Sequence, residues 1–275
     1  MLLNTWLSVA RRHFSSANPR RVDRVGKQRS LRTEPLEERL LLAGTPIVLN
    51  ALVINPDNQA AYTNAVGGLV INSAHLAGKD GLVIEGISVS ATSGDAISVN
   101  LSGIALRRLA IDTVNVSQYS NLGMNISLTN VTGLESIALE DIVTTGTKRG
   151  LSLMLNNTDT NALTIDDSTF PGVIVTATNG ADIHNGVVTG NKISAPAGVE
   201  GVLLNVISTA ATPSTADNFQ IIDNIQISTL DRDAVQVNAT GYYNPTTKVT
   251  TSSLDGLNIS NNKIGAAEGA NVLFR

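Results

Sequence analysis

Residues 254–274, LDGLNISNNKIGAAEGANVLF, contain the pattern that decides the fold of this chain. Two short runs carry apolar residues at every second position: Leu257 with Ile259, and Val272 with Phe274. An asparagine-bearing corner and a turn of small residues lie between them. Alternation with this period is typical of β-strands, whereas a helix repeats every ~3.6 residues. The stretch therefore predicts short strands joined by a corner and a turn.

Related stretches recur upstream, among them residues 219–238 and 183–206. The first strands are expected at Leu82/Ile84, Leu109/Ile111, Ile137/Leu139, Leu163/Ile165, Gly186/Val188, Gln220/Ile222 and Leu257/Ile259. The second strands are expected at Ile97/Val99, Ile126/Leu128, Leu153/Leu155, Val173/Val175, Val202/Leu204, Val235/Val237 and Val272/Phe274. Successive copies lie roughly 21 to 37 residues apart, a period typical of solenoids. The pattern predicts an all-β solenoid of about seven coils over residues 81–275.

Asparagines mark the expected corners of this solenoid. They follow the second strands in five copies, at Asn100, Asn130, Asn156, Asn205 and Asn238. Asn-Lys-Ile also recurs at residues 191–193 and 262–264. Asparagine tolerates left-handed backbone, and identical side chains stacked at about 4.8 Å can hydrogen-bond along the stack. We therefore expect structural asparagine ladders in a parallel β-helix, which is right-handed because parallel crossovers are.

The core is expected to consist of Val, Ile, Leu and Ala, because 42% of the residues are hydrophobic but only 3% are aromatic. The chain has no cysteine, so its stability must come from stacking and hydrogen-bonded ladders. Residues 45–80 are expected to form an N-terminal cap. The chain stops at Arg275 directly after a second strand. We expect either a fragment truncated from a longer gene product or end-to-end association through an uncapped coil.

Charge is divided unevenly along the chain. Residues 1–39 hold nine Lys or Arg against four Asp or Glu, while the remainder holds ten against nineteen. The acidic body argues against nucleic acid as a partner, because phosphates need clustered Lys and Arg. Spaced carboxylates instead suit solubility or Ca²⁺, and no other cofactor is expected. No apolar run is long enough to form a transmembrane helix.

Residues 1–44 differ in character from the rest and are expected to be mostly disordered or helical. A basic region, the cluster Leu40 to Leu42 and the small residues Ala43 and Gly44 follow the order of a secretory signal. An amphipathic N-terminal helix is the alternative. The string EPLEERLLLAG, residues 34–44, resembles the PLExRxLL export segment of planctomycete-type secreted and surface proteins. The resemblance implies a secreted or cell-surface location and no particular activity.

The body, residues 81–275, resembles in its pattern the right-handed parallel β-helix, or pectin-lyase-like, superfamily. Those members that are enzymes act on polysaccharides. Others are adhesins, surface-layer components or phage spikes. The resemblance therefore implies a fold without deciding between catalysis and binding.

One position offers a candidate catalytic site. The residue two before each second strand is Asp95, Met124, Arg149, Pro171, Glu200, Asp233 or Ala270. Stacking would place Glu200 and Asp233 about 5 Å apart, a separation that suits a retaining glycosidase or a Ca²⁺ site. Arg149 would lie two coils away. The alternative is a solvated turn position that favours acidic residues.

Two other acidic pairs, Glu140-Asp141 and Asp166-Asp167, are expected not to form a site, because adjacent strand residues point to opposite faces. Two functions remain open. The first is a non-catalytic structural or adhesive protein of the cell surface, bound to extracellular polysaccharide or other surface proteins. The second is a polysaccharide lyase or glycoside hydrolase that uses Glu200, Asp233 and Arg149.

Overall fold

The computed structural model describes residues 50–209, 212–241, 243–244, 249–250, 254–266 and 268–275. All of the described residues belong to one compact unit of the chain, the second unit, Val48–Arg275. The predicted export segment, residues 1–44, lies outside the described residues.

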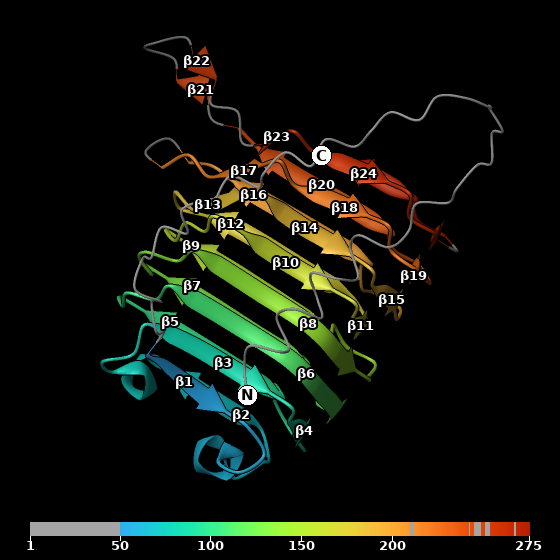
Figure 1. Ribbon diagram of the computed structural model, residues 1–275. Helices are drawn as coiled ribbons and strands as arrows, with labels where there is room; N and C mark the ends of the chain where they lie inside the picture. The colour runs from blue at the N-terminus through green and yellow to red at the C-terminus, as the bar shows by residue number, and fades with distance from the viewer. Residues whose placement is uncertain (1–49, 210–211, 242, 245–248, 251–253, 267) are drawn as a thin grey trace, which may run out of the picture. The chain divides into compact units, whose positions relative to one another are not determined.

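Almost all of the regular secondary structure among the described residues of this unit is β-strand, and most of the strands lie in parallel sheets (Figure 1), which confirms the all-β prediction. The described residues contain no α-helix, only the short 3₁₀-helices η1 (Gln59–Tyr62) and η2 (Ser73–Leu76). Within the same residues, no helix has the length and apolar character needed to cross a bilayer.

An eight-stranded parallel sheet forms one side of the unit. Its strands, in spatial order, are β2 (Leu69–Asn72), β5 (Ile97–Ser102), β7 (Met124–Thr129), β9 (Leu151–Asn156), β12 (Val173–Thr178), β16 (Val202–Ile207), β20 (Val235–Thr240) and β26 (Val272–Phe274). The strands from β5 to β20 have six residues each and pair without a shift in register. Spatial neighbours are therefore equivalent residues of successive repeats.

A thirteen-stranded sheet forms the second side. One arm contains β1 (Ala51–Ile54), β3 (Gly81–Glu85), β10 (Leu163–Asp166), β14 (Gly186–Thr189), β18 (Gln220–Ile222) and β24 (Asn258–Ser260). The other contains β4 (Ser88–Ser90), β11 (Thr169–Phe170), β15 (Lys192–Ala195), β19 (Gln226–Thr229) and β25 (Ile264–Ala266). The long strands β6 (Arg108–Gln118) and β8 (Ser136–Thr144) run through both arms and join them.

Two smaller sheets complete the unit. The parallel strands β13 (Asp182–His184), β17 (Thr215–Asp217) and β23 (Leu254–Asp255) form a third side in the C-terminal half. The antiparallel pair β21 (Tyr243–Asn244) and β22 (Val249–Thr250) forms a separate hairpin. Because β1 pairs with β3 and β2 pairs with β5, residues 51–72 already contribute strands to both large sheets.

The inward side chains of the sheets form one continuous core made mainly of Val, Ile and Leu. One predicted strand pair is wrong by one residue. The structure buries Phe219 and Ile221 rather than Gln220 and Ile222, and it pairs Ile221 with Val188. The ring of Phe219 occupies the space left by Gly186, where an added Cβ would lie 2.3 Å from the ring.

A column of left-handed residues bends the chain between the two arms of the thirteen-stranded sheet. The strand registers place these residues on consecutive repeats, each with φ between 46° and 67°. They are Gly86, Thr113, Asp141, Asp167, Gly190, Asp223 and Asn261. Gly, Asn and Asp are the residues that adopt this conformation most readily, and Thr113 is the β-branched exception. The corner thus recurs at one position in every repeat.

The residue after this corner points into the core and changes character along the stack. Ile87, Val114 and Ile142 occupy the position in the N-terminal repeats, and Ser168, Asn191, Asn224 and Asn262 occupy it afterwards. Asn191 and Asn224 are almost fully buried. The Oδ1 atom of Asn224 accepts hydrogen bonds from the backbone N–H and the Nδ2 of Asn191, both at 3.1 Å, and Asn262 repeats the arrangement with Asn224. The asparagine ladder expected at Asn191 and Asn262 is confirmed.

The ladder expected after the second strands is only partly present. Asn130 alone of its five members is left-handed, and it stacks on Asn157, whose Nδ2 donates to Asn130 Oδ1 at 2.7 Å. Asn205 and Asn238 instead lie within β16 and β20, where they bond to each other at 2.8 Å. Asn100 lies within β5. The five asparagines occupy three register positions: one for Asn100, Asn205 and Asn238, one for Asn156 and one for Asn130. The prediction placed them at a single position, because spacing along the sequence does not determine the register of the strands.

We predict that Asn191→Ala lowers the free energy of unfolding by about 3 kcal/mol, because several buried backbone groups lose their partner at once. The Asn191 side chain bonds the carbonyls of Ile165 and Thr189 and the N–H of Ser168. Urea unfolding followed by circular dichroism measures the loss. The exposed Asn258→Ala is the matched control, expected within about 0.5 kcal/mol of the parent. Equal losses in the two variants would contradict a structural ladder.

Candidate functional site

The candidate catalytic residues lie in one column, just before the strands of the eight-stranded sheet. The registers align Arg149, Pro171, Glu200 and Asp233 on successive repeats. The column also contains Leu122 in place of the expected Met124, since Met124 is the first residue of β7. The sequence thus identified the column correctly except at that one position.

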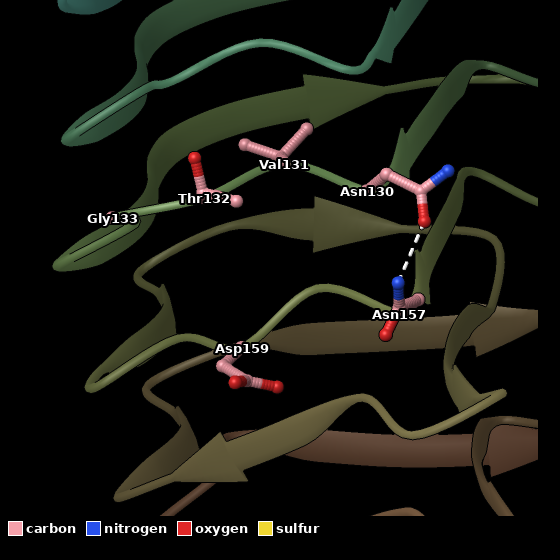
Figure 2. A pocket seen from close by; sticks show the side chains of 6 residues that line it. All are labelled: Asn130, Val131, Thr132, Gly133, Asn157 and Asp159. Carbon is pink, nitrogen blue, oxygen red and sulfur yellow. Dashed lines mark hydrogen bonds between the residues drawn. The ribbon is translucent and has the colours of Figure 1, made fainter. Parts of the chain in front are cut away.

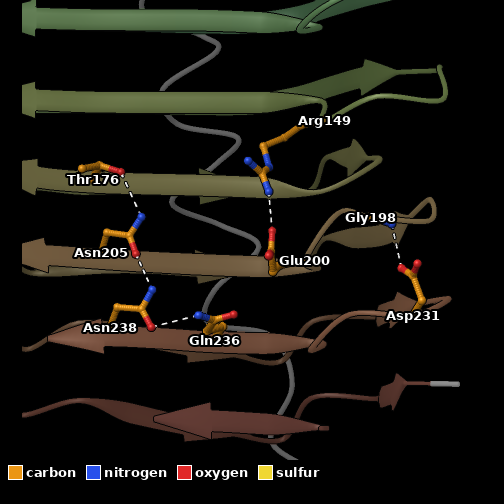
Figure 3. Close-up of polar contacts among 8 residues, drawn as sticks. All are labelled: Arg149, Thr176, Gly198, Glu200, Asn205, Asp231, Gln236 and Asn238. Carbon is orange, nitrogen blue, oxygen red and sulfur yellow. Dashed lines mark hydrogen bonds and ion pairs between the residues drawn. The ribbon is translucent and has the colours of Figure 1, made fainter. Parts of the chain in front are cut away.

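The structure brings Arg149 and Glu200 together. Arg149 Nη2 donates to Glu200 Oε2 at 2.5 Å (Figure 3), although the backbones are two repeats apart and Pro171 lies between them. The side chains are 21% and 19% exposed. The extended arginine reaches across the short proline, so a positive and a negative charge cancel at a half-buried site.

Asp233 faces the other way along the stack. Its Oδ1 accepts a hydrogen bond of 2.9 Å from the backbone N–H of Ala270, in the next repeat. Asp95, in the same column, binds the N–H of Leu122 in the same manner at 3.1 Å. In both cases the carboxylate completes the ladder of backbone bonds at the point where the sheet begins. Glu200 and Asp233 therefore each contact a different partner, in opposite directions.

A second cluster of carboxylates lies on the outer face of the thirteen-stranded sheet. Strand pairing aligns Glu85, Asp112, Glu140 and Asp166 on four adjacent strands. The column is not visible in pairs of neighbouring residues along the chain, because its members adjoin only across strands. Its signal was the recurrence of an acidic residue at the end of successive first strands.

Glu140 occupies the middle of this acidic column. Burial, together with the charges of Asp112, Asp166 and Asp141, raises the pKa of Glu140 above its ordinary value, and Arg108 opposes the shift. The protonated form is therefore favoured in the folded chain more than in the unfolded chain. Asp141 belongs to the left-handed corner, so the two members of the Glu140-Asp141 pair have separate structural settings.

A polar hollow of about 260 Å³ lies beside the corner that follows the eight-stranded sheet (Figure 2). Asn130, Gly133, Asn157 and Asp159 line it together with the short side chains between them. Asp159 Oδ1 accepts a hydrogen bond from the N–H of Asp182 at 3.0 Å, in the next repeat. Neither Arg149, Glu200 nor Asp233 borders this hollow.

Among the described residues, no three His, Cys, Asp or Glu side chains are arranged to hold a metal ion. No protein-family model matches the chain, and neither a curated protein nor a solved structure matches it. The site must therefore be interpreted from its own geometry.

We predict an interaction free energy of about 1 kcal/mol between Arg149 and Glu200, measured by a double-mutant cycle of Arg149→Ala and Glu200→Ala. The exposed pair Arg107 and Glu135 is the matched control, with side chains 32% and 56% exposed. Water screens that pair, so its interaction should stay below about 0.5 kcal/mol. Equal interaction free energies in the two cycles would contradict a larger contribution of the Arg149–Glu200 pair to stability.

We predict that Glu140→Gln raises the urea midpoint at pH 7 and leaves it unchanged below the ordinary glutamate pKa of 4.5. A raised folded pKa means that the contribution of Glu140 to stability is greatest at low pH and is lost as pH rises from 4.5 to the folded value. Unfolding curves at several pH values test this. Thr164→Val, a neutral change on the same face, should give a difference from the parent that does not vary with pH.

Proposed function

We propose that the second unit is a right-handed parallel β-helix of about seven coils. The proposal is supported by the strict register of equivalent strands and by the left-handed corner that recurs in every repeat. Right-handed crossovers are the rule for parallel strands in one sheet. Each coil then contributes one strand to the eight-stranded sheet and one or two strands to the thirteen-stranded sheet.

We further propose that this β-helix is a structural or adhesive protein, secreted or held at the cell surface, without catalytic activity. The export segment expected in residues 34–44 supports the location. The observation that carries the non-catalytic role is the engagement of Glu200 with Arg149 and of Asp233 with the Ala270 N–H. A catalytic carboxylate pair has to converge on one substrate bond. These two carboxylates instead bind groups of other repeats within the same unit.

The alternative is a polysaccharide lyase or glycoside hydrolase. It would use Glu200 and Asp233 as the carboxylate pair and Arg149 to bind an anionic sugar, with Ca²⁺ as a possible cofactor. The column supplies the residue types, which keeps this alternative testable. It would require both carboxylates to leave their present partners when substrate binds.

An activity screen separates the two functions. The chain is incubated with acidic and neutral polysaccharides, with and without Ca²⁺, beside Glu200→Ala and Asp233→Ala. We expect no cleavage by the parent. Cleavage that both substitutions abolish, in variants that keep the β-sheet circular dichroism spectrum, would establish the enzyme and overturn the structural role.

Location is tested in the source organism by protease treatment of intact cells and by analysis of the medium. We expect the protein outside the cytoplasm. Replacement of Leu40, Leu41 and Leu42 by serine should retain it inside, because the apolar cluster of the export segment is lost. The control is a variant in which Ser15, Ser16 and Ala17 are all replaced by threonine, which leaves the apolar cluster unchanged. A protein that stays cytoplasmic with its leader intact would refute the proposed location.

A further inference from the structure

The strands of the eight-stranded sheet contain no charged residue. None of its 43 strand residues is Asp, Glu, Lys or Arg, whereas the strands of the thirteen-stranded sheet contain seven. A solvated surface typically carries about a quarter to a third charged residues. Depletion of charge is instead a mark of the centre of a protein–protein interface.

The side chains on this face are short, polar or aliphatic, and arranged in straight columns. The outward residues are Val70, Asn72, Ser98, Asn100, Ser102, Asn125, Ser127, Thr129, Ser152, Met154, Asn156, Ile174, Thr176, Thr178, Leu203, Asn205, Ile207, Gln236, Asn238, Thr240 and Leu273. Most are half-buried or exposed, and Leu203 and Gln236 are the most covered. The unbroken register makes the face regular over six strands.

Part of the face is already ordered by its own hydrogen bonds. Asn238 Nδ2 donates to Asn205 Oδ1 at 2.8 Å, and Asn205 Nδ2 donates to Thr176 Oγ1 at 3.5 Å (Figure 3). Gln236 Nε2 donates to Asn238 Oδ1 at 2.9 Å. Side chains held in this way lose less conformational entropy when a partner covers them. The half-buried Ile174 lies beside this network, and its partner in register, Leu203, is already buried.

The size of the face fits a stable interface. Each strand residue covers about 16 Å² of a sheet, from a rise of about 3.3 Å and a strand spacing of about 4.8 Å. The whole sheet therefore presents roughly 700 Å², and two such faces would bury roughly 1,400 Å². Stable interfaces bury about 1,200 to 2,000 Å² in total.

The chemistry of the face favours a second copy of the chain as its occupant. Amides and hydroxyls both donate and accept hydrogen bonds, so the face is complementary to itself. A two-fold axis would bring the same columns together in both directions. A nucleic acid would need cations, and a glycan platform would present aromatic rings for stacking. The outward positions provide neither.

We infer that two copies of this protein pack face to face through the outer surface of the eight-stranded sheet. This dimer is independent of the proposed location and of any contact at the end of the stack. It requires that a charge introduced on the middle strand of the face weakens association, while the same charge on the other large sheet has no effect.

The test is sedimentation equilibrium of the 275-residue chain, whose monomer mass is 28.8 kDa. We expect twice this mass for the parent at micromolar concentration. Ser152→Lys, on the face at the middle strand β9, should weaken association at least about 100-fold, because a charge covered by the partner copy loses its hydration without gaining an opposite charge. Thr164→Lys, outward on β10 of the other sheet, should leave the dimer intact. A monomeric parent, or a dimer that Ser152→Lys leaves unchanged, would overturn the inference.

A second readout covers the case in which Ser152→Lys fails to fold. The chain has no cysteine, so a single introduced thiol reports its own surroundings. Single changes Ser98→Cys, Ser127→Cys and Ser152→Cys are treated with a bifunctional maleimide that spans about 10 Å, the distance between packed sheets. At least one should give a covalent dimer, while Thr164→Cys should not. Equal cross-linking at Thr164, or none on the face, would refute the face-to-face arrangement.

Discussion

Every feature of this molecule depends on the backbone hydrogen bonds between successive repeats. A parallel ladder pairs each residue with its equivalent, so every repeat has to bend at the same position. The left-handed column from Gly86 to Asn261 satisfies that requirement, with Gly, Asn or Asp at six of seven places. Loops elsewhere are free to vary in length because they lie outside the ladder.

The sequence predicted the all-β parallel arrangement and the asparagine ladder at Asn191 and Asn262, because alternation and corner chemistry are local properties. It assigned one strand wrongly at residues 219–222, FQII, where apolar residues occupy both parities. The deciding partner was Gly186, whose missing side chain leaves room for Phe219. Which alternating set of residues faces the core here depends on a contact between repeats, and the alternation of one strand does not reveal that contact.

The candidate site illustrates the same limit. Its column was predictable because strand entry recurs at a constant offset. The partners were not, because side-chain length decides whether a residue reaches one repeat or two. Arg149 extends past Pro171 to Glu200, whereas the short Asp233 reaches only the neighbouring N–H of Ala270. The acidic column around Glu140 was missed because it exists only across strands.

The inner corner residue changes from Ile142 to Ser168 and Asn191. The repeats on the two sides of this change therefore contact their neighbours at the corner in different ways. At this inner position the N-terminal repeats meet through apolar contacts, which have no fixed direction. From Ser168 onward each repeat donates its backbone N–H to the side-chain oxygen of the next repeat, and the oxygens of Asn224 and Asn262 each accept two such bonds. A duplicated repeat would find ready partners in the second part, since one asparagine extends the series. An additional repeat is therefore accommodated more easily in the C-terminal half, because its asparagine would make the same hydrogen bonds as those already present.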